Sequence, residues 1–454
     1  MLWCLRGKVP LWGSEQFHRQ LSSTLLATSR KAVSYSNRAA TYSSLCSCTK
    51  LINNNIKLST LRFVHTSRAQ KSSAIPGAVN LSGATTGSQA ASVSNAMSKL
   101  MTEAQTKRVS VYFMGLAVMT VGAVVLGGIT RLTESGLSMT NWHPLFGIRP
   151  PMTAAEWEEE FKEYQKYPEY KYTNMHMTVD EFKSIFYMEW FHRIWGRMIG
   201  VVYAVPAAYY LTRKWVPSSV KRPIGLVGLL IGCQGLMGWY MVKSGLHEDP
   251  DPNAVPRVSQ YRLCAHLGLA LVIYTVTFWQ GLKNMTTPAK ITDLRAVSLK
   301  YRVHGAAGLI FLTALSGAFV AGLDAGLTYN SFPKMADRWV PTDMWAFSPW
   351  YRNILENPTT VQFNHRVLGM TTATTVLWLW AQSRKARLPY RAKVAVNCMA
   401  GMVCLQVSLG IATLLYFVPT PLAVTHQSGS VALLTTALWV MNELRFARKA
   451  IPRL

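Results

Sequence analysis

Residues 189–193 read Glu-Trp-Phe-His-Arg, and residues 362–366 read Gln-Phe-Asn-His-Arg. The two motifs lie near the starts of two long, mainly apolar segments, Tyr187–Leu211 and Val361–Gln382. A membrane-spanning helix needs about 20 mainly apolar residues, which both segments supply. Because ionisable residues inside such a span are expensive and usually functional, the repeated His-Arg pair indicates both the fold class and the site.

Six further spans are predicted from stretches without charge. Val394–Asn442 is uncharged for 49 residues, which is too long for one crossing, and Pro419 and Pro421 divide it into two. Four more stretches are uncharged for 20 to 22 residues: Val109–Thr130, Pro223–Val242, Leu263–Leu282 and Val303–Leu323. The sequence therefore predicts an all-α polytopic membrane protein with eight transmembrane helices.

The two halves of the chain repeat each other. The motif at residues 127–133 follows the first span, and the related motif at residues 322–328 follows the fifth. Each half has an even number of spans, so both halves enter the membrane in the same direction. We therefore expect two parallel-repeat four-helix bundles, at residues 109–282 and 303–445, joined by a linker at residues 283–302.

The positive charge is concentrated at the N-terminus. The 454-residue chain has 47 Lys and Arg against 21 Asp and Glu, and residues 1–100 hold 12 basic side chains but only one acidic one. Residues 1–70 lack a secretory hydrophobic core and are typical of a mitochondrial transit peptide, with a disordered basic tail as the alternative. Residues 71–108 are expected to form a flexible matrix linker. Targeting and topology thus explain the charge without nucleic-acid binding.

Lys and Arg also gather in alternate loops between the predicted spans. The basic positions are Lys107, Arg108, Arg213, Lys214, Lys221, Arg222, Lys283, Lys290, Arg295, Lys300, Arg302, Arg384, Lys385, Arg387, Arg391, Lys393, Arg445, Arg448, Lys449 and Arg453. The opposite loops are mixed or acidic. By the positive-inside rule, both termini, including a basic tail at residues 446–454, are expected in the matrix of a multi-pass inner-membrane protein.

Four histidines are the candidate site. His192, His266, His365 and His426 each lie near the start of an even-numbered span, and so toward the intermembrane-space face. Taken alone, any one of these histidines could equally be a hydrogen-bonded packing residue or a functional residue. Two per half, on facing helices, can supply both axial ligands of a heme iron. Carboxylate clusters are missing beside them, which argues against a di-iron or zinc centre.

The halves differ at one position beside these histidines. Glu189 is three residues before His192 and on the same helix face, whereas its counterpart is Gln362. The carboxylate predicts chemistry in the first half, by moving protons or stabilising a developing cation, and electron transfer alone in the second. An ion pair between Glu189 and Arg193 is the alternative, and both roles are compatible.

Other polar residues carry weaker signals. Arg193 and Arg366 can neutralise heme propionates, or can simply extend toward lipid headgroups. His304 has no counterpart and is expected to be structural, and His143, His176 and His247 lie in loops without an assigned role. Four cysteines lie in apolar segments and are interpreted as small buried hydrophobes: Cys233, Cys264, Cys398 and Cys404.

Several motifs in order resemble mitochondrial heme A synthase over about Val109 to Arg445. They stand at residues 128–138, 189–193, 258–262, 330–335 and 425–427. The resemblance implies oxidation of a methyl group of heme O to the formyl group of heme A, which cytochrome c oxidase requires. One departure is that residues 131–186 lack the cysteine pair often present in bacterial relatives. The acidic insertion at about residues 143–186 is expected to be a solvated loop, with a docking surface as the alternative.

Roles for individual residues also follow from the resemblance. His192 and His266 would ligate the substrate heme O, with Glu189 essential for catalysis, and His365 and His426 would ligate a heme b cofactor. A mitochondrial ferredoxin would donate electrons. Heme O synthase, cytochrome c oxidase assembly factors and membrane lipid are the other partners implied, and an apolar bundle is compatible with a homo-oligomer.

Two other protein classes fit part of the pattern. An electron-transfer cytochrome with two bis-histidine hemes accounts for the histidines, but it does not need the difference between Glu189 and Gln362. A transporter built on a parallel repeat is favoured by helices broken in mid-membrane. The break at Pro419 and Pro421 lies between spans and gives that class little support.

Overall fold

The computed structural model describes residues 85–142, 149–213, 218–247 and 256–449. The chain divides into two units, Met1–Ser82 and Gly83–Leu454, and the described residues belong to the second. The expected transit peptide at residues 1–70 lies outside them, as do residues 71–84 of the expected linker and the last five of the basic tail.

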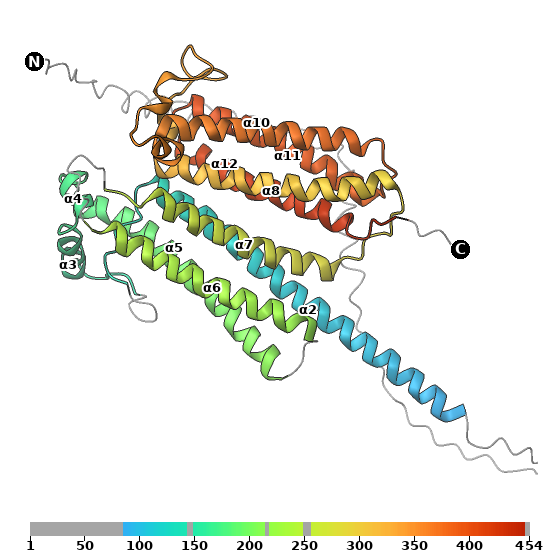
Figure 1. Ribbon diagram of the computed structural model, residues 1–454. Helices are drawn as coiled ribbons and strands as arrows, with labels where there is room; N and C mark the ends of the chain where they lie inside the picture. Colours follow the sequence, from blue (N-terminus) through green and yellow to red (C-terminus); the bar gives the residue numbers. More distant parts are fainter. Residues whose placement is uncertain (1–84, 143–148, 214–217, 248–255, 450–454) are drawn as a thin grey trace, which may run out of the picture. The chain divides into compact units, whose positions relative to one another are not determined.

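Long helices dominate the described part of the chain (Figure 1). Each apolar stretch identified in the sequence falls on one of them: α2 (Thr85–Leu132), α5 (Val179–Thr212), α6 (Ser218–Gly245), α7 (Gln260–Met285), α8 (Leu294–Gly322), α10 (Pro358–Ser383), α11 (Tyr390–Leu415) and α12 (Thr420–Glu443). Shorter elements occupy the loops: α3 (Ala154–Tyr164), α4 (Pro168–Tyr172), η1 (Ala325–Leu327), η2 (Thr342–Trp345), η3 (Trp350–Arg352) and α9 (Asn353–Glu356).

Five helices of the described residues are long and apolar enough to cross a membrane, so the chain is an all-α membrane protein. These candidate spans lie in α2, α6, α7, α8 and α11. The helices α5, α10 and α12 are not among them, and each carries a histidine with other polar side chains of the candidate site. Polar site residues lower the mean hydropathy of a span, so the prediction of eight crossings stays a prediction.

Helix α2 begins earlier than the sequence suggested. It starts at Thr85, so residues 85–108, which were expected to belong to a flexible linker, are helical. The segment has no proline, which would interrupt a helix. Once a helix has formed in the apolar residues beyond Val109, it can grow toward the N-terminus at a low free-energy cost, because each added residue gains a hydrogen bond and no new nucleus has to form.

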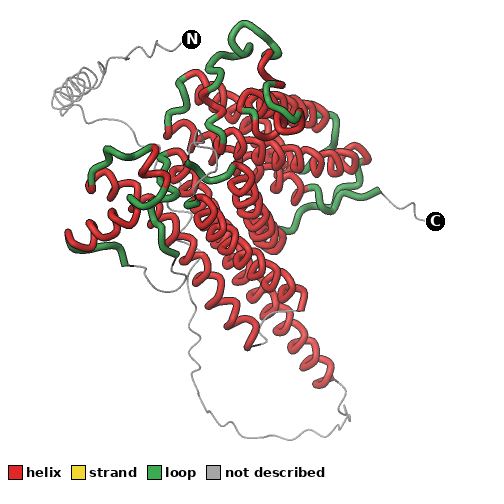
Figure 2. The backbone as a smooth tube through the Cα atoms, turned by 60° about the vertical axis from the view of Figure 1, so that its left-hand side comes forward, coloured by secondary structure: helices red, strands yellow, loops and turns green. Residues whose placement is uncertain are grey.

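The helices pack in two connected sets (Figure 2). In one set, α2 packs against α5 and α7, and α6 packs against α7; in the other, α8 packs against α10 and α12, and α11 packs against α10 and α12. Contacts of α7 with α8 and of α2 with α12 join the sets. Polar groups reinforce this junction, since Gln427 Nε2 donates to the Val124 carbonyl at 2.8 Å and Tyr274 hydrogen-bonds Thr435 at 2.5 Å.

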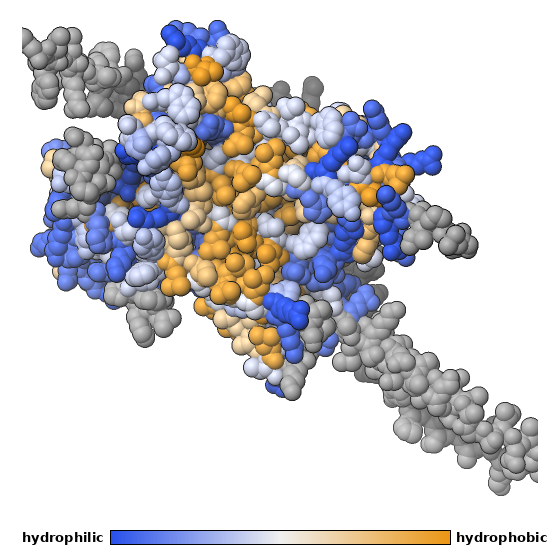
Figure 3. Space-filling model, in the orientation of Figure 1, coloured by the Kyte–Doolittle hydropathy of each residue, from blue (hydrophilic) through white to orange (hydrophobic). Residues whose placement is uncertain are grey.

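The outer surface fits a lipid environment. Apolar side chains cover the middle of the face in Figure 3, and hydrophilic ones gather toward its two ends. Val205, Leu229 and Leu236 are 65–66% exposed on this surface, where lipid rather than water can cover them. Cys233, Cys398 and Cys404 are exposed too, so reading them as buried was wrong. Apolar character alone does not distinguish the core-facing from the lipid-facing side of a membrane helix.

The insertion before α5 is packed rather than a solvated loop, and we call its helices α3 and α4 the cap. Trp157, Phe161 and Tyr164 recur at helical spacing on α3 and bury one face against Phe182 and Phe186 of α5. Capping boxes begin both helices, with Thr153 and Glu156 at α3 and Thr178 and Glu181 at α5. The acidic residues noted in the sequence mostly lie on the other face of α3, so the expectation of a solvated loop was correct for that face only.

Candidate functional site

All four candidate histidines line one internal cavity. Its volume is about 1210 Å³, which exceeds the roughly 300–1,000 Å³ of ordinary small-molecule pockets. The lining is mainly apolar and comes from both sets of helices, with His192 and His266 on one side and His365 and His426 on the other. A cavity of this size has room for more than one large, flat, apolar ligand.

The histidines face each other in two matched pairs. The ring centroids of His192 and His266 are 6.5 Å apart with the rings at 87°, and those of His365 and His426 are 6.4 Å apart at 89°. Two imidazoles that bind one metal ion through bonds of about 2 Å have centroids about 6 Å apart. Both pairs therefore fit a bis-histidine iron, and their role as ligands stays a prediction.

Hydrogen bonds hold the rings and leave nitrogens available. Ser316 Oγ hydrogen-bonds His365 Nδ1 at 2.7 Å, which leaves Nε2 for a ligand. Gln234 and Gln406 are equivalent, since each donates from Nε2 to the backbone carbonyl of the histidine on the next helix, His266 and His426. Nδ1 of each of those two histidines is buried without a hydrogen-bond partner among the described residues. An unsatisfied buried nitrogen at both places is what a site for a bound group requires.

Glycines make room for the rings. A Cβ atom at Gly238 would meet His266 Cε1 at 3.2 Å, and one at Gly410 would meet His426 Cε1 at 2.8 Å. The same relation in both halves shows that each of these two rings lies directly against helix backbone.

Gly410→Ala is expected to weaken heme binding at His365 and His426 by about tenfold. This is the lower end of the losses in affinity seen when a residue that positions a metal ligand is changed. The new methyl group would push the His426 ring out of line with His365. Gly401→Ala on the same helix is the control, because a Cβ there has no neighbour within 4 Å. Titration of each purified variant with heme measures the effect, and equal affinities for both variants would contradict it.

Glu189 is buried at the cavity wall, with its oxygens fully used as acceptors. Ser138 Oγ and the Met139 backbone N–H each donate to Oε2 at 2.8 Å, and Arg193 donates to Oε1 from Nη2 at 2.6 Å and from Nε at 3.0 Å. The expected ion pair between Glu189 and Arg193 is therefore present. It is buried, since only 2 to 3% of Glu189 is exposed.

The second half repeats this arrangement with an amide. Gln362 Nε2 donates to the carbonyls of Ala325 and Tyr329 at 2.8 and 3.1 Å, and its Oε1 accepts from Arg366 at 3.1 Å. Arg193 and Arg366 also donate to loop carbonyls, at Met139 and Asn141 in one half and at Tyr329, Ser331 and Lys334 in the other. Both arginines line the cavity while holding a loop in place.

The family described as cytochrome oxidase assembly protein, COX15-CtaA, matches residues 110–438, which include all of these side chains. The chain belongs to this family. Its residues are 56% identical over 326 positions to heme A synthase COX15 of Bos taurus and of Homo sapiens, a match that covers 71% of this chain and 79% of each relative. The resemblance that the motifs indicated is confirmed.

More distant relatives keep the same name. Heme A synthase COX15 of Saccharomyces cerevisiae is 44% identical over 371 residues, covering 75% of this chain and 76% of the relative. A heme A synthase-mitochondrial ferredoxin fusion protein of Schizosaccharomyces pombe is 42% identical over 370 residues, covering 74% of this chain and 60% of the fusion.

Two features of this COX15-CtaA family member were not found from the sequence. Asp324, just after α8, links this loop to the last turn of α2 and to the segment before α7, because it accepts from Arg131 at 2.8 Å and from Arg257 at 3.0 Å. Glu169 of α4 is 7% exposed and lines the cavity. Asp324 stands in the repeated motif at residues 322–328, but its arginine partners are far from it in the sequence, and Glu169 lies outside the motifs. The aromatic spacing of α3 was a usable signal for the cap that carries Glu169.

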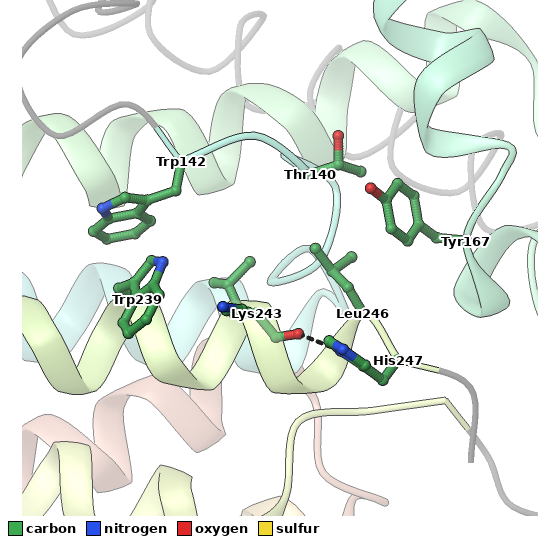
Figure 4. A pocket seen from close by; sticks show the side chains of 8 residues that line it. Thr140, Trp142, Tyr167, Trp239, Lys243, Leu246 and His247 are labelled. Atoms are coloured by element: carbon green, nitrogen blue, oxygen red, sulfur yellow. Dashed lines mark hydrogen bonds between the residues drawn. The ribbon is translucent and has the colours of Figure 1, made fainter. Parts of the chain in front are cut away.

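A smaller pocket adjoins the main cavity. It has a volume of about 330 Å³, and Trp142 and Trp239 line both spaces (Figure 4). Lys243 Nζ lies 5.0 Å from the Trp239 ring centroid, and the Lys243 carbonyl oxygen is 2.7 Å from His247 Nδ1. His304 makes the same local contact with the Lys300 carbonyl at 2.7 Å, and it does not line the cavity.

Proposed function

We propose that this chain is a mitochondrial heme A synthase of the inner membrane, which oxidises the methyl group of heme O to the formyl group of heme A for cytochrome c oxidase biogenesis. The observation that carries the proposal is the presence of two near-perpendicular imidazole pairs, 6.5 and 6.4 Å between centroids, on one cavity, with Glu189 in the first half where the second half has Gln362. The names of the relatives support the same activity.

The two pairs have different tasks in this proposal. His192 and His266 hold the iron of the substrate heme O, and His365 and His426 hold heme b, which when bound supplies one-electron transfer. Glu189 is the catalytic residue of the first pocket, where its fixed negative charge stabilises a cation that develops on the substrate. Gln362 keeps the same shape without the charge, as suits a pocket that only relays electrons.

Arg193 and Arg366 contribute positive charge at the cavity wall, where heme propionates need neutralisation. Their N–H groups already donate to loop carbonyls, so a propionate would share donors with the protein rather than fill an empty site. This arrangement would couple propionate binding to the position of each loop.

A mitochondrial ferredoxin would be the electron donor. The fusion of a heme A synthase to a mitochondrial ferredoxin in one relative supports that donor. Eight spans in two parallel four-helix repeats, with both termini in the matrix and the histidines toward the intermembrane space, complete the proposal. The matching contacts of Glu189 with Arg193 and of Gln362 with Arg366 support the repeat.

Extraction and chromatography of the hemes that copurify with the chain test this function. We expect heme b together with heme O, heme A or a partly oxidised form. Two equivalents of heme b alone would instead favour an electron carrier. A preparation without heme would refute both and revive the transporter.

A further inference from the structure

The cap before α5 carries a second carboxylate into the cavity. Glu169 is the second residue of the short helix α4, after Pro168, and it is 7% exposed. The packing of α3 on α5 fixes it there, because Tyr164 is fully buried in the aromatic cluster and donates to Glu169 Oε2 at 3.1 Å. Asn174 in turn donates to the Tyr164 hydroxyl at 2.8 Å.

The surroundings of Glu169 and Glu189 differ sharply. Glu189 accepts from two guanidinium nitrogens, a hydroxyl and a backbone N–H, whereas one hydroxyl donates to the Glu169 carboxylate. The pKa of Glu169 is raised to about 8, mainly by burial and in addition by the negative charges of Glu189 and Glu134, while the hydrogen bond from Tyr164 and the charge of Arg131 oppose the rise. A buried carboxyl group with few donors beside a carboxylate that accepts several hydrogen bonds is a usual basis for dividing acid and charge-stabilising roles.

We propose that Glu169 is the proton donor of the first-half pocket, supplying protons from the aqueous cap to the cavity while Glu189 remains the fixed negative charge. The proposal rests on the proposed function. When one oxygen atom of dioxygen enters a C–H bond of the methyl group, the other leaves as water, and the step takes up two electrons from the one-electron donor and two protons. Glu169 gives a proton to that water and is protonated again from the aqueous side.

The position of Glu169 suits this role. It lines the cavity together with Thr173, Glu134 and Arg131, and it lies on α4, outside the predicted spans. A carboxylic acid that is protonated at neutral pH can donate there, whereas the donors around Glu189 commit both of its oxygens as acceptors.

Glu169→Gln is the main test, because the amide oxygen can still accept from Tyr164. We expect purified Glu169→Gln protein to keep both hemes, to accumulate unconverted heme O, and to form heme A at least about 100-fold more slowly, as for loss of a general acid. Glu159→Gln is the matched control, since Glu159 is exposed on the same cap. Unchanged conversion in Glu169→Gln would overturn the proposal, and loss of the first heme would show a structural role instead.

The pH dependence separates a proton donor from a structural residue. Heme A formation by the parent protein should fall as the pH rises through about 8, where Glu169 loses its proton. Tyr164→Phe removes the one donor that stabilises the Glu169 carboxylate, so this alkaline limb should move to higher pH. A limb that stays at the same pH in Tyr164→Phe would contradict the assignment.

Thermal unfolding gives a readout that needs no activity. Because the folded state raises the pKa of Glu169, its contribution to stability is fully present below the pKa of an unfolded glutamate and is lost as the pH rises through about 8. The melting temperature of the parent should therefore fall more between pH 7 and pH 9 than that of Glu169→Gln. Parallel curves would refute a buried protonated Glu169. A parent chain that never converts heme O would refute the proposed function while leaving this comparison intact.

Discussion

Replacing Glu189 with glutamine is expected to reduce heme A formation by at least about 100-fold while heme b stays bound, because the fixed negative charge beside the substrate is lost. The substitution keeps the shape of the side chain but places an amide N–H₂ group among donors. Arg193, Ser138 and the Met139 backbone N–H all donate to the two oxygens of Glu189. Reversed-phase separation of extracted hemes, beside the reduced spectrum of heme b, measures both outcomes.

Folding must be separated from chemistry in this variant. Removing one partner of a buried ion pair costs about 3–5 kcal/mol, so Glu189→Gln lowers stability as well as activity. Glu189→Asp keeps the charge and the pair with Arg193 and should retain more activity than Glu189→Gln. Glu159→Gln, the same change at an exposed position, is the matched control and should leave heme O oxidation within a fewfold of the parent. Parental heme A levels in Glu189→Gln would eliminate the catalytic role of Glu189.

Local composition predicted the helices but not their ends. The six charge-free spans and the two spans that carry the His-Arg motifs each fall on a long helix, because bilayer thickness sets a length that is visible in the sequence. The early start of α2 at Thr85 was missed, since residues 85–108 are polar and carry no apolar signal. The cap was missed too, because burial of Tyr164 depends on the separate helix α5 and not on its neighbours in sequence.

The repeat predicted which histidines belong together. The division into halves grouped His192 with His266 and His365 with His426, and the rings of each pair do face each other. Repetition helps because two copies of one fold must place equivalent residues equivalently. The same reasoning cannot reveal Glu169, because the cap that carries it is present in one half alone and has no counterpart for comparison. The role of Asp324 was hidden for a related reason, since its partners Arg131 and Arg257 are both far from it in the sequence.

His426→Ala is expected to remove the low-spin b-type spectrum and to lower the heme content from two per chain to one. The His426 ring faces His365 at 6.4 Å between centroids, and its Nδ1 is buried without a partner among the described residues. An alanine leaves the iron with one protein ligand and opens space at the ring's position, so weak, high-spin heme at most should remain. Optical and electron paramagnetic resonance spectra of the purified variant measure the change.

The pattern across variants decides between ligand and packing roles. His192→Ala should lose bound heme O and keep the b-type spectrum, because its ring faces His266 on the other side of the cavity. His304→Ala should keep both, since His304 does not line the cavity and its hydrogen bond among the described residues is to the Lys300 carbonyl in its own helix. A normal b-type spectrum in His426→Ala would reject the ligand assignment. Loss of both hemes in every variant, His304→Ala included, would mean that histidine substitutions act through folding. If His192→Ala and His426→Ala each remove a different heme, the two pockets are independent sites, and Glu189, whose counterpart in the other half is Gln362, then marks the one where the substrate is oxidised.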